Sequence, residues 1–268
     1  MFIKRLYSSI ILCLLVTVAL FSSLAFYFVV VCFVTLALYE FFTMLERRKI
    51  PTFKYFGTLL GVIIPITIML RFELTKKWEL FFIVLALFSL FIMQLKRQEN
   101  EGAVISIATT LFGILYVSWF FSFVIRLRML QHGLGFVIML LIITKFGDIG
   151  AYLVGKGFGK HPLIPHVSPN KSIEGALGGL VFSMLGTILV KPLVPFSLIH
   201  LFLIGLVGGI LAQLGDLFES LMKRDCLIKD SSDFIPGIGG VLDLIDSILF
   251  VAPALYFYAH ILLGTLEM

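Results

Sequence analysis

Long apolar runs alternate with short polar segments along almost the whole chain. A helix needs about 20 apolar residues to cross the hydrocarbon core of a bilayer, where only helices and closed barrels satisfy their own backbone hydrogen bonds. About nine runs approach this length, and they cover residues 8–21, 24–45, 56–70, 78–95, 103–125, 134–154, 173–190, 198–222 and 241–263. The pattern predicts an all-α, polytopic integral membrane protein with about nine transmembrane helices.

The basic residues between these runs predict an orientation. Lys4 and Arg5 precede an apolar stretch, as in a signal peptide, but no polar cleavage region follows, so we expect an uncleaved first helix. Only Ser22 and Ser23 separate it from the second run. With the N-terminus inside, lysine and arginine are more frequent in the inside loops than in the outside loops, as the positive-inside rule requires. We therefore expect a multi-pass protein of the inner (cytoplasmic) membrane, with a cytoplasmic N-terminus.

The composition of the chain also indicates that most of it is surrounded by a lipid bilayer. Hydrophobic residues make up 60% of the chain, charged residues only 14%, and the mean hydropathy is +1.08. In a soluble protein, a formal net charge of +5 would suggest nucleic acid as a partner. Here the basic residues lie in short loops between apolar runs, so we predict no nucleic-acid partner. The three cysteines, Cys13, Cys32 and Cys226, show neither a disulfide framework nor a zinc-site spacing.

Ionisable residues divide the chain into two predicted regions. Residues 1–130 hold almost no charge within their runs, so they are predicted to be an N-terminal scaffold of about five helices. Residues 131–268 are predicted to be the catalytic region, with about four helices and two cytoplasmic motif loops that carry the active site. Small-x-x-x-small pairs at Gly175/Gly179 and Gly205/Gly209 predict close helix packing there.

The first polar interruption of the catalytic region surrounds Asp148. Lys145 and Asp148 share a helix face within an apolar run, and such groups usually face a cavity or a partner. The alternative is an ion pair that joins two helices. The following segment, 155–175, is rich in glycine and lysine, which suits phosphate binding, with Ser172 as an N-cap and Lys171 at the positive helix end. An ordinary basic loop followed by a cap is the alternative reading.

The second interruption, residues 211–250, combines carboxylates, cations and a glycine turn. Asp216, Glu219 and Lys223 share one helix face, and Asp243 and Asp246 open the last helix. Carboxylates without cysteine or histidine are the ligands of a hard cation such as Mg²⁺, although ion pairing with lysine would also explain them. Together with the basic loop, they indicate phosphoryl-type transfer.

Residues 220–246, SLMKRDCLIKDSSDFIPGIGGVLDLID, resemble the signature of phosphatidate cytidylyltransferases (CDP-diacylglycerol synthases). The matching positions are Ser220, Lys223, Arg224, Lys229, Asp230, Pro236, Gly237, Gly239, Gly240, Asp243 and Asp246. Segments 147–152, 168–175 and 213–220 also resemble blocks of that family, in the family's order. Ile238 and Leu244 depart from it, because many members have histidine and arginine there, and this leaves substrate detail and rate open.

The resemblance implies a Mg²⁺-dependent enzyme that transfers a cytidylyl group from CTP to phosphatidic acid, giving CDP-diacylglycerol and pyrophosphate for phospholipid synthesis. It implies CTP, phosphatidic acid and the lipid bilayer as partners, with a homodimer as a possible assembly. By the same resemblance, Asp216, Asp243 and Asp246 hold the metal, and Lys223, Arg224, Lys229 and Asp230 are catalytic. The substrate-binding residues it implies are Asp148, Ser168, Lys171, Glu174, Gly239 and Gly240.

Three other functions remain open at this point. A CTP-dependent polyprenol or lipid kinase shares the nucleotide and the membrane but not this signature. A CDP-alcohol phosphotransferase needs an Asp-Gly-x-x-Ala-Arg block, which the sequence lacks. An ion-coupled transporter, from a different class, would use Asp148 and Asp216 as intramembrane cation carriers, but it would not explain the clustered lysine, arginine and glycine.

Overall fold

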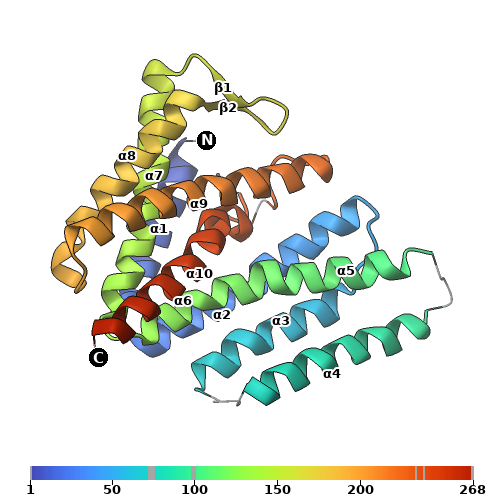
Figure 1. The fold of residues 1–268 in the computed structure, drawn as a ribbon. Coiled ribbons are helices and arrows are strands. Elements are labelled where there is room, and N and C mark those ends of the chain that lie inside the picture. Colours follow the sequence, from blue (N-terminus) through green and yellow to red (C-terminus); the bar gives the residue numbers. More distant parts are fainter. Residues whose placement is uncertain (1, 72–75, 98–100, 233, 238, 267–268) are drawn as a thin grey trace. The chain divides into compact units, whose positions relative to one another are not determined.

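The structure, a computed structural model, describes residues 2–71, 76–97, 101–232, 234–237 and 239–266 (Figure 1). Its helices are α1 (Phe2–Phe21), α2 (Ser23–Arg47), α3 (Lys54–Met69), α4 (Lys76–Leu95), α5 (Ala103–Gly113), the π-helical η1 (Ile114–Trp119), α6 (Phe120–Met129), α7 (Gly133–Phe158), α8 (Ile173–Leu189), the 3-10 turn η2 (Lys191–Leu193), α9 (Leu198–Asp225) and α10 (Val241–Leu266). The strands β1 (Pro162–Ile164) and β2 (Ser168–Ser172) form an antiparallel hairpin.

Every predicted apolar run falls on helical residues, apart from its last residue in runs 56–70 and 173–190, and run 103–125 covers the consecutive helices α5, η1 and α6. The helices extend up to six residues beyond the predicted runs, and the predicted helical class is confirmed. Five helical stretches in the described part of the chain are long and apolar enough to cross a membrane: Ser23–Arg47, Ala103–Met129, Gly133–Phe158, Leu198–Asp225 and Val241–Gly264. By contrast, α8 has 17 residues, which at about 1.5 Å per residue span about 26 Å, less than a typical hydrocarbon core. The number of spans and the orientation of the N-terminus stay predictions.

The β1–β2 hairpin was not predicted. Pro162 pairs with Ser172 and Ile164 with Ser168, with an irregularity between the two pairs. Strands of three and five residues that contain proline show no readable alternation of apolar and polar positions, so the sequence pattern is that of a loop. In the second half of the chain, the hairpin adds a small sheet that precedes α8 directly.

The chain forms two compact units. The first unit contains Met1–Ile125 and Cys226–Leu242, and the second unit contains Arg126–Asp225 and Asp243–Met268. The segment between α9 and α10 therefore belongs with the N-terminal helices, although it carries part of the resemblance. The functional division into 1–130 and 131–268 stays a prediction.

Aromatic side chains of α2 form the core of the first unit. Phe41 and Phe42 are almost fully buried, and their rings meet edge to face with 5.4 Å between centroids. An added Cβ at Gly57 of α3 would lie 2.7 Å from the Phe42 ring, and one at Gly113 would lie 2.6 Å from the Phe41 ring. Glycine at these positions lets the helices accept the two rings, which fixes α2 against α3 and α5.

Close helix packing dominates the second unit, where α7 packs along α8 and α8 along α9. The hairpin lies at one end of α7 and α8 (Figure 1). A Cβ at Gly179 would lie 3.0 Å from the backbone oxygen of Gly147, and a Cβ at Gly205 would lie 2.6 Å from the Cα of Met184. These contacts confirm the packing role predicted for the small-residue pattern.

Candidate functional site

Three carboxylates of the second unit, one each from α7, α9 and α10, lie near one another. A Cβ at Gly215 would lie 2.5 Å from the backbone oxygen of Asp246, so glycine allows α9 and α10 to approach closely there. Asp216 follows Gly215, and it interacts electrostatically with Asp246 and with Asp148 of α7. Asp148 and Asp246 also repel one another. We call Asp148, Asp216 and Asp246 the carboxylate cluster.

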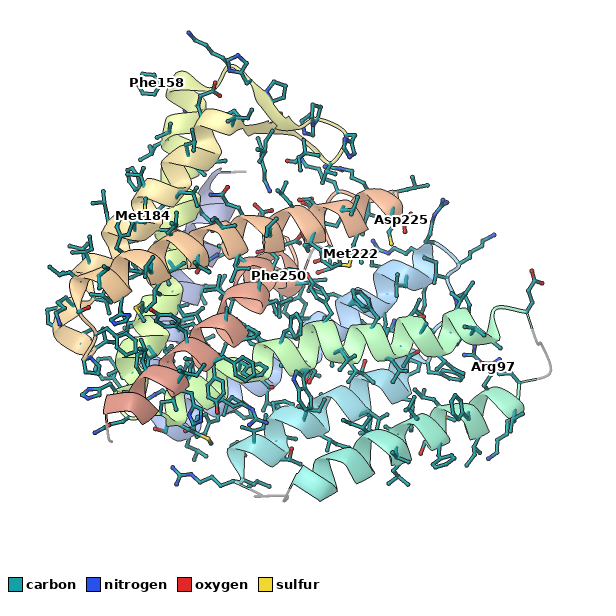
Figure 2. The ribbon with its side chains drawn as sticks, viewed as in Figure 1. Arg97, Phe158, Met184, Met222, Asp225 and Phe250 are labelled. Atoms are coloured by element: carbon teal, nitrogen blue, oxygen red, sulfur yellow. The ribbon has the colours of Figure 1, made fainter. Side chains whose placement is uncertain are left out.

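Aromatic packing also joins α9 to α10 beside the cluster. The rings of Phe218 and Phe250 lie 5.8 Å apart between centroids, at an interplanar angle of 57°. Phe250 is labelled on α10 in Figure 2, which also shows Met222 and Asp225 in the last turns of α9. Lys223 and Arg224 lie between Met222 and Asp225. The charged last turn of α9 therefore comes shortly after the residue that makes this aromatic contact.

Two lysines compensate the charge of the carboxylate cluster. Lys171 Nζ, from β2, lies 2.5 Å from Asp216 Oδ2. Lys145 Nζ lies 3.2 Å from Asp148 Oδ2 and 3.5 Å from the backbone oxygen of Leu244. The Lys145–Asp148 pair forms within α7 and does not by itself join two helices. The ion pair is therefore present but lies within one helix, and Asp148 also lines a cavity, as the polar-site interpretation expects.

The cavity has a volume of about 470 Å³ and lies within the second unit. Polar residues in its lining include Asp148, Lys156, Asn170, Lys171, Gln213 and Asp216. Gln213 Nε2 donates a hydrogen bond of 2.9 Å to the backbone oxygen of Ala176, which orients this side chain. Ligand pockets typically have volumes of about 300–1,000 Å³. The cavity therefore offers room for a small polar ligand between acidic and basic groups.

Lys223 is the centre of a second charged group. Its ammonium lies 2.5 Å from Asp243 Oδ1 and forms an ion pair with Glu219 one turn earlier. The side chains of Lys223 and Asp243 are 12% exposed, and that of Glu219 is 1% exposed. Burial of these charges is tolerated because they compensate one another. Glu219 was placed on this helix face from its spacing but was left out of the predicted site, although its i,i+4 relation to Lys223 is a readable signal.

The hairpin is held by Glu174 and Arg224. Glu174 Oε2 accepts hydrogen bonds from the backbone N–H groups of Lys160 at 3.1 Å and His161 at 3.2 Å, and Oε1 lies 2.6 Å from His161 Nδ1. Arg224 Nε donates to the backbone oxygen of Val167 at 3.2 Å. Both oxygens of Glu174 thus contact the protein, and its predicted role toward substrate stays a prediction, as does that of Arg224.

The start of α8 agrees with the sequence analysis. Ser172 Oγ accepts a hydrogen bond of 3.1 Å from the backbone N–H of Gly175, which confirms the predicted N-cap. Ser168 lies at the start of β2 opposite Ile164 and is partly exposed. The hairpin and the cap together bring Lys171 to α9.

Four predicted site residues belong to the first unit. Lys229 and Asp230 are exposed, whereas Gly239 and Gly240 are buried. Gly239 has a φ of 121° and pairs with Ile235, so glycine is favoured there by the backbone conformation. Ile238, one of the two departures from the resembling family, lies outside the described residues. These four residues therefore belong to another unit than the residues that line the cavity.

The predicted metal ligands divide between the two charged groups. Asp216 and Asp246 belong to the carboxylate cluster, and Asp243 pairs with Lys223. Among the described residues, no group of three histidine, cysteine, aspartate or glutamate side chains is arranged to hold a metal ion. The donors are nevertheless carboxylate oxygens, which suit Mg²⁺, and a cation would relieve the repulsion within the cluster. The magnesium site stays a prediction.

Comparison with known proteins shows that the similarity extends beyond the motifs described above. A family model described as the cytidylyltransferase family matches residues 3–262. Over 147 residues, the chain is 46% identical to a phosphatidate cytidylyltransferase of Bacillus subtilis (strain 168), a match that covers 53% of this chain and 54% of the relative.

Two further relatives give similar matches. The chain is 37% identical over 150 residues to the uncharacterized protein YnbB of Escherichia coli (strain K12), covering 56% of this chain and 50% of that protein. It is 40% identical over 159 residues to a phosphatidate cytidylyltransferase of Staphylococcus aureus (strain COL), covering 59% and 60%. The chain thus spans about half to three fifths of the length of these relatives. The resemblance inferred from the motifs is confirmed, and because the family match extends over almost all of its residues, the chain belongs to the cytidylyltransferase family.

Proposed function

We propose that this protein transfers a cytidylyl group from CTP to phosphatidic acid, forming CDP-diacylglycerol and pyrophosphate. The observation that carries the proposal is the ion pair of Lys171 with Asp216 at a cavity that Asp148 also lines. Acidic and basic groups side by side suit a reaction in which phosphate groups must be held close together. Two relatives named phosphatidate cytidylyltransferase support the choice of substrates.

The proposed reaction is a substitution at phosphorus. A phosphate oxygen of phosphatidic acid forms a bond to the α-phosphorus of CTP, and the bond from that phosphorus to the bridging oxygen of the β-phosphate breaks, so that pyrophosphate leaves. Both substrates are polyanions, and their mutual repulsion must be offset before they can approach. Positioning by fixed cations therefore supplies much of the rate.

The positions of three lysines in the second unit support this proposal. Lys171 and Lys156 line the cavity, and the ion pair with Asp216 holds the Lys171 ammonium in place. Lys223 is oriented by Glu219 and Asp243 in a largely buried site. We assign these ammonium groups to neutralising the substrate phosphates. The roles of Arg224, Lys229 and Asp230 in the reaction are proposed from their motif positions.

Mg²⁺ is the proposed cofactor, with Asp216, Asp243 and Asp246 as its ligands. The support is the chemistry of the donors, since all three supply carboxylate oxygens, and the mutual repulsion of Asp216 and Asp246. When bound, the metal would neutralise charge on the nucleotide phosphates.

A membrane setting follows from the substrates as well as from the helices. The acyl chains of phosphatidic acid remain in lipid, whereas CTP comes from water, so the proposed site lies at a membrane surface. The proposal includes about nine spans, a cytoplasmic N-terminus, an inner-membrane location with the site facing the cytoplasm, and a homodimer as a possible assembly. Five helices of suitable length and hydropathy, counted within the described residues, support it.

One labelling experiment tests the reaction. Membranes containing the protein are given CTP labelled at the α-phosphate, with or without phosphatidic acid, and chloroform-soluble label is counted. We expect label in the lipid fraction only when phosphatidic acid is present. A parallel reaction with γ-labelled CTP separates the alternatives, because a lipid kinase would transfer the γ-label to lipid and a transporter would transfer neither label. Either of these two results would contradict the proposal.

A further inference from the structure

Glu40 carries a buried charge that the proposed reaction does not use. It lies in α2, within the region assigned to scaffold, and only 5% of the residue is exposed. A buried carboxylate is costly unless hydrogen bonds or opposite charges compensate it. The partners of Glu40 therefore indicate what this residue does.

Both carboxylate oxygens of Glu40 accept hydrogen bonds from one distant segment of the same unit. Oε1 accepts from Ser232 Oγ at 2.5 Å and from the backbone N–H of Val241 at 3.0 Å. Oε2 accepts from Ser231 Oγ at 3.2 Å and from the backbone N–H of Leu242 at 2.8 Å. Two donors lie in the segment between α9 and α10 and two in the first turn of α10, all at least 191 positions from Glu40 in the sequence.

Glu40 acts as the cap of α10. Val241 and Leu242 are the first two residues of this helix, and their N–H groups have no acceptor within it. The residue before them, Gly240, has no side chain that could cap the helix, as serine or aspartate would do. Glu40 supplies the acceptor from another helix, and its negative charge is favourable at the positive end of the helix dipole.

The close approach of Glu40 also explains Gly240. An added Cβ at Gly240 would lie 1.9 Å from Ser231 Oγ and 2.5 Å from Glu40 Oε2. Any other residue would therefore displace the carboxylate or the serine. A second N-terminal helix supports the same segment, because Ser8 Oγ of α1 donates a hydrogen bond of 2.9 Å to the backbone oxygen of Pro236. The segment that carries the glycine motif is thus held in place by residues of the predicted scaffold.

We infer that Glu40 is a positioning residue for the proposed cytidylyl transfer, on which this inference rests. It fixes Ser231, Ser232 and the start of α10, the helix in which Asp243 and Asp246 follow. A shift at the start of this helix moves both carboxylates along with it. A misplacement of about 1 Å can reduce an enzymatic rate about 100-fold.

Three single variants of the full chain test the inference in membranes. Glu40→Ala removes all four acceptor contacts, and Glu40→Gln removes the charge and leaves one oxygen as an acceptor, since its NH₂ group only donates. Glu46→Gln is the matched control, because Glu46 lies in the same helix, is 47% exposed and pairs with Lys54. We expect kcat to fall about 10-fold or more in both Glu40 variants with KM for CTP within about twofold, and Glu46→Gln to stay within about twofold of wild type.

A double-mutant cycle separates positioning from general destabilisation. Ser232→Ala removes one donor to Glu40. If the two residues act through their contact, Ser232→Ala lowers kcat in the wild-type background and has little further effect in the Glu40→Ala background. Hydrogen exchange adds a readout that needs no activity: Glu40→Gln should speed exchange of the Val241 and Leu242 amides, and Glu46→Gln should not.

The outcomes separate this inference from the proposed reaction. A wild-type protein that forms no CTP-dependent lipid product overturns the proposed function, and the role of Glu40 in it. An active wild type whose Glu40 variants keep the wild-type kcat overturns the inference alone, as do additive effects with Ser232→Ala or unchanged amide exchange. If Glu40→Ala does not accumulate in membranes, Glu40→Gln and Ser232→Ala carry the test.

Discussion

Lys171 Nζ lies 2.5 Å from Asp216 Oδ2, an ion pair that joins the β1–β2 hairpin to α9 at the lining of the cavity. The two side chains are 30% and 34% exposed, so water and ligands can reach them. An exposed pair of this kind contributes little to stability. The pair instead holds the Lys171 ammonium group in a defined place beside a cavity of ligand size.

Replacement of Lys171 should therefore reduce activity more than stability. A hydrogen bond to a charged group contributes about 1.5–3 kcal/mol, so Lys171→Ala should lower kcat/KM for the lipid transfer about 10- to 100-fold. Lys160→Ala is the matched control, because Lys160 is an exposed lysine just before the same hairpin. Initial rates over a range of CTP concentrations measure the effect. Equal losses in the two variants would show that the net charge of the hairpin matters and the Lys171–Asp216 pair does not.

Lys223 should contribute to stability as well as to activity. Lys223→Met would leave the buried Glu219 and Asp243 carboxylates without their cation. Breaking a buried pair by removing one partner costs about 3–5 kcal/mol, so we expect a clear decrease in the free energy of unfolding. Thermal unfolding of the purified protein in detergent measures it. Lys229→Met, at an exposed lysine of the next loop, should change stability by about 0.5 kcal/mol or less; a Lys223→Met protein as stable as this control would contradict the buried ion pairs.

The helices were predictable because a long apolar run in a bilayer can satisfy its backbone hydrogen bonds in few ways other than a helix. The hairpin was not, since its strands are too short to show a pattern and they are held by contacts from Glu174 and Arg224. Glu174 contacts the residues just before β1, 13 and 14 positions away, and Arg224 contacts the turn between the strands, 57 positions away, so no local motif shows these contacts.

The candidate site was predictable where it depends on helical spacing. The i,i+4 spacing of Glu219 and Lys223 placed them on one face, and they form an ion pair. Partners from distant segments were not predictable in this way. Lys171 meets Asp216 only because β2 packs on α9, and Glu40 meets Leu242 only because the segment before α10 belongs with the N-terminal helices.

Gly215→Ala should disturb the carboxylate cluster through the backbone. An added Cβ would lie 2.5 Å from the backbone oxygen of Asp246, so α9 and α10 must separate or shift to accept it. Overpacking of this kind costs about 1–3 kcal/mol, and activity should fall because Asp216 and Asp246 move apart. Gly264→Ala is the control, since nothing lies within 4 Å of a Cβ there. Thermal unfolding and the labelling assay measure the two effects; wild-type behaviour of Gly215→Ala would contradict the close approach of the helices.

The metal proposal predicts different consequences for two aspartates of α10. Asp243 is paired with Lys223, whereas Asp246 is 7% exposed and lies in the carboxylate cluster. Asp243→Asn and Asp246→Asn should each abolish Mg²⁺-dependent formation of CDP-diacylglycerol while folded protein is retained. Asp246→Asn should be tolerated better by the fold, because it removes a repulsive charge, whereas Asp243→Asn weakens an ion pair.

Chelation and a matched variant complete the test of the metal. EDTA should abolish activity of the wild type, and added Mg²⁺ should restore it. Asp225→Asn, at the exposed end of α9, should keep both the activity and its dependence on Mg²⁺. Wild-type activity in Asp243→Asn or Asp246→Asn would refute the assignment of that residue as a ligand. Activity that persists in EDTA would refute the requirement for a metal altogether, and would leave Lys171, Lys156 and Lys223 as the groups that neutralise the substrate phosphates.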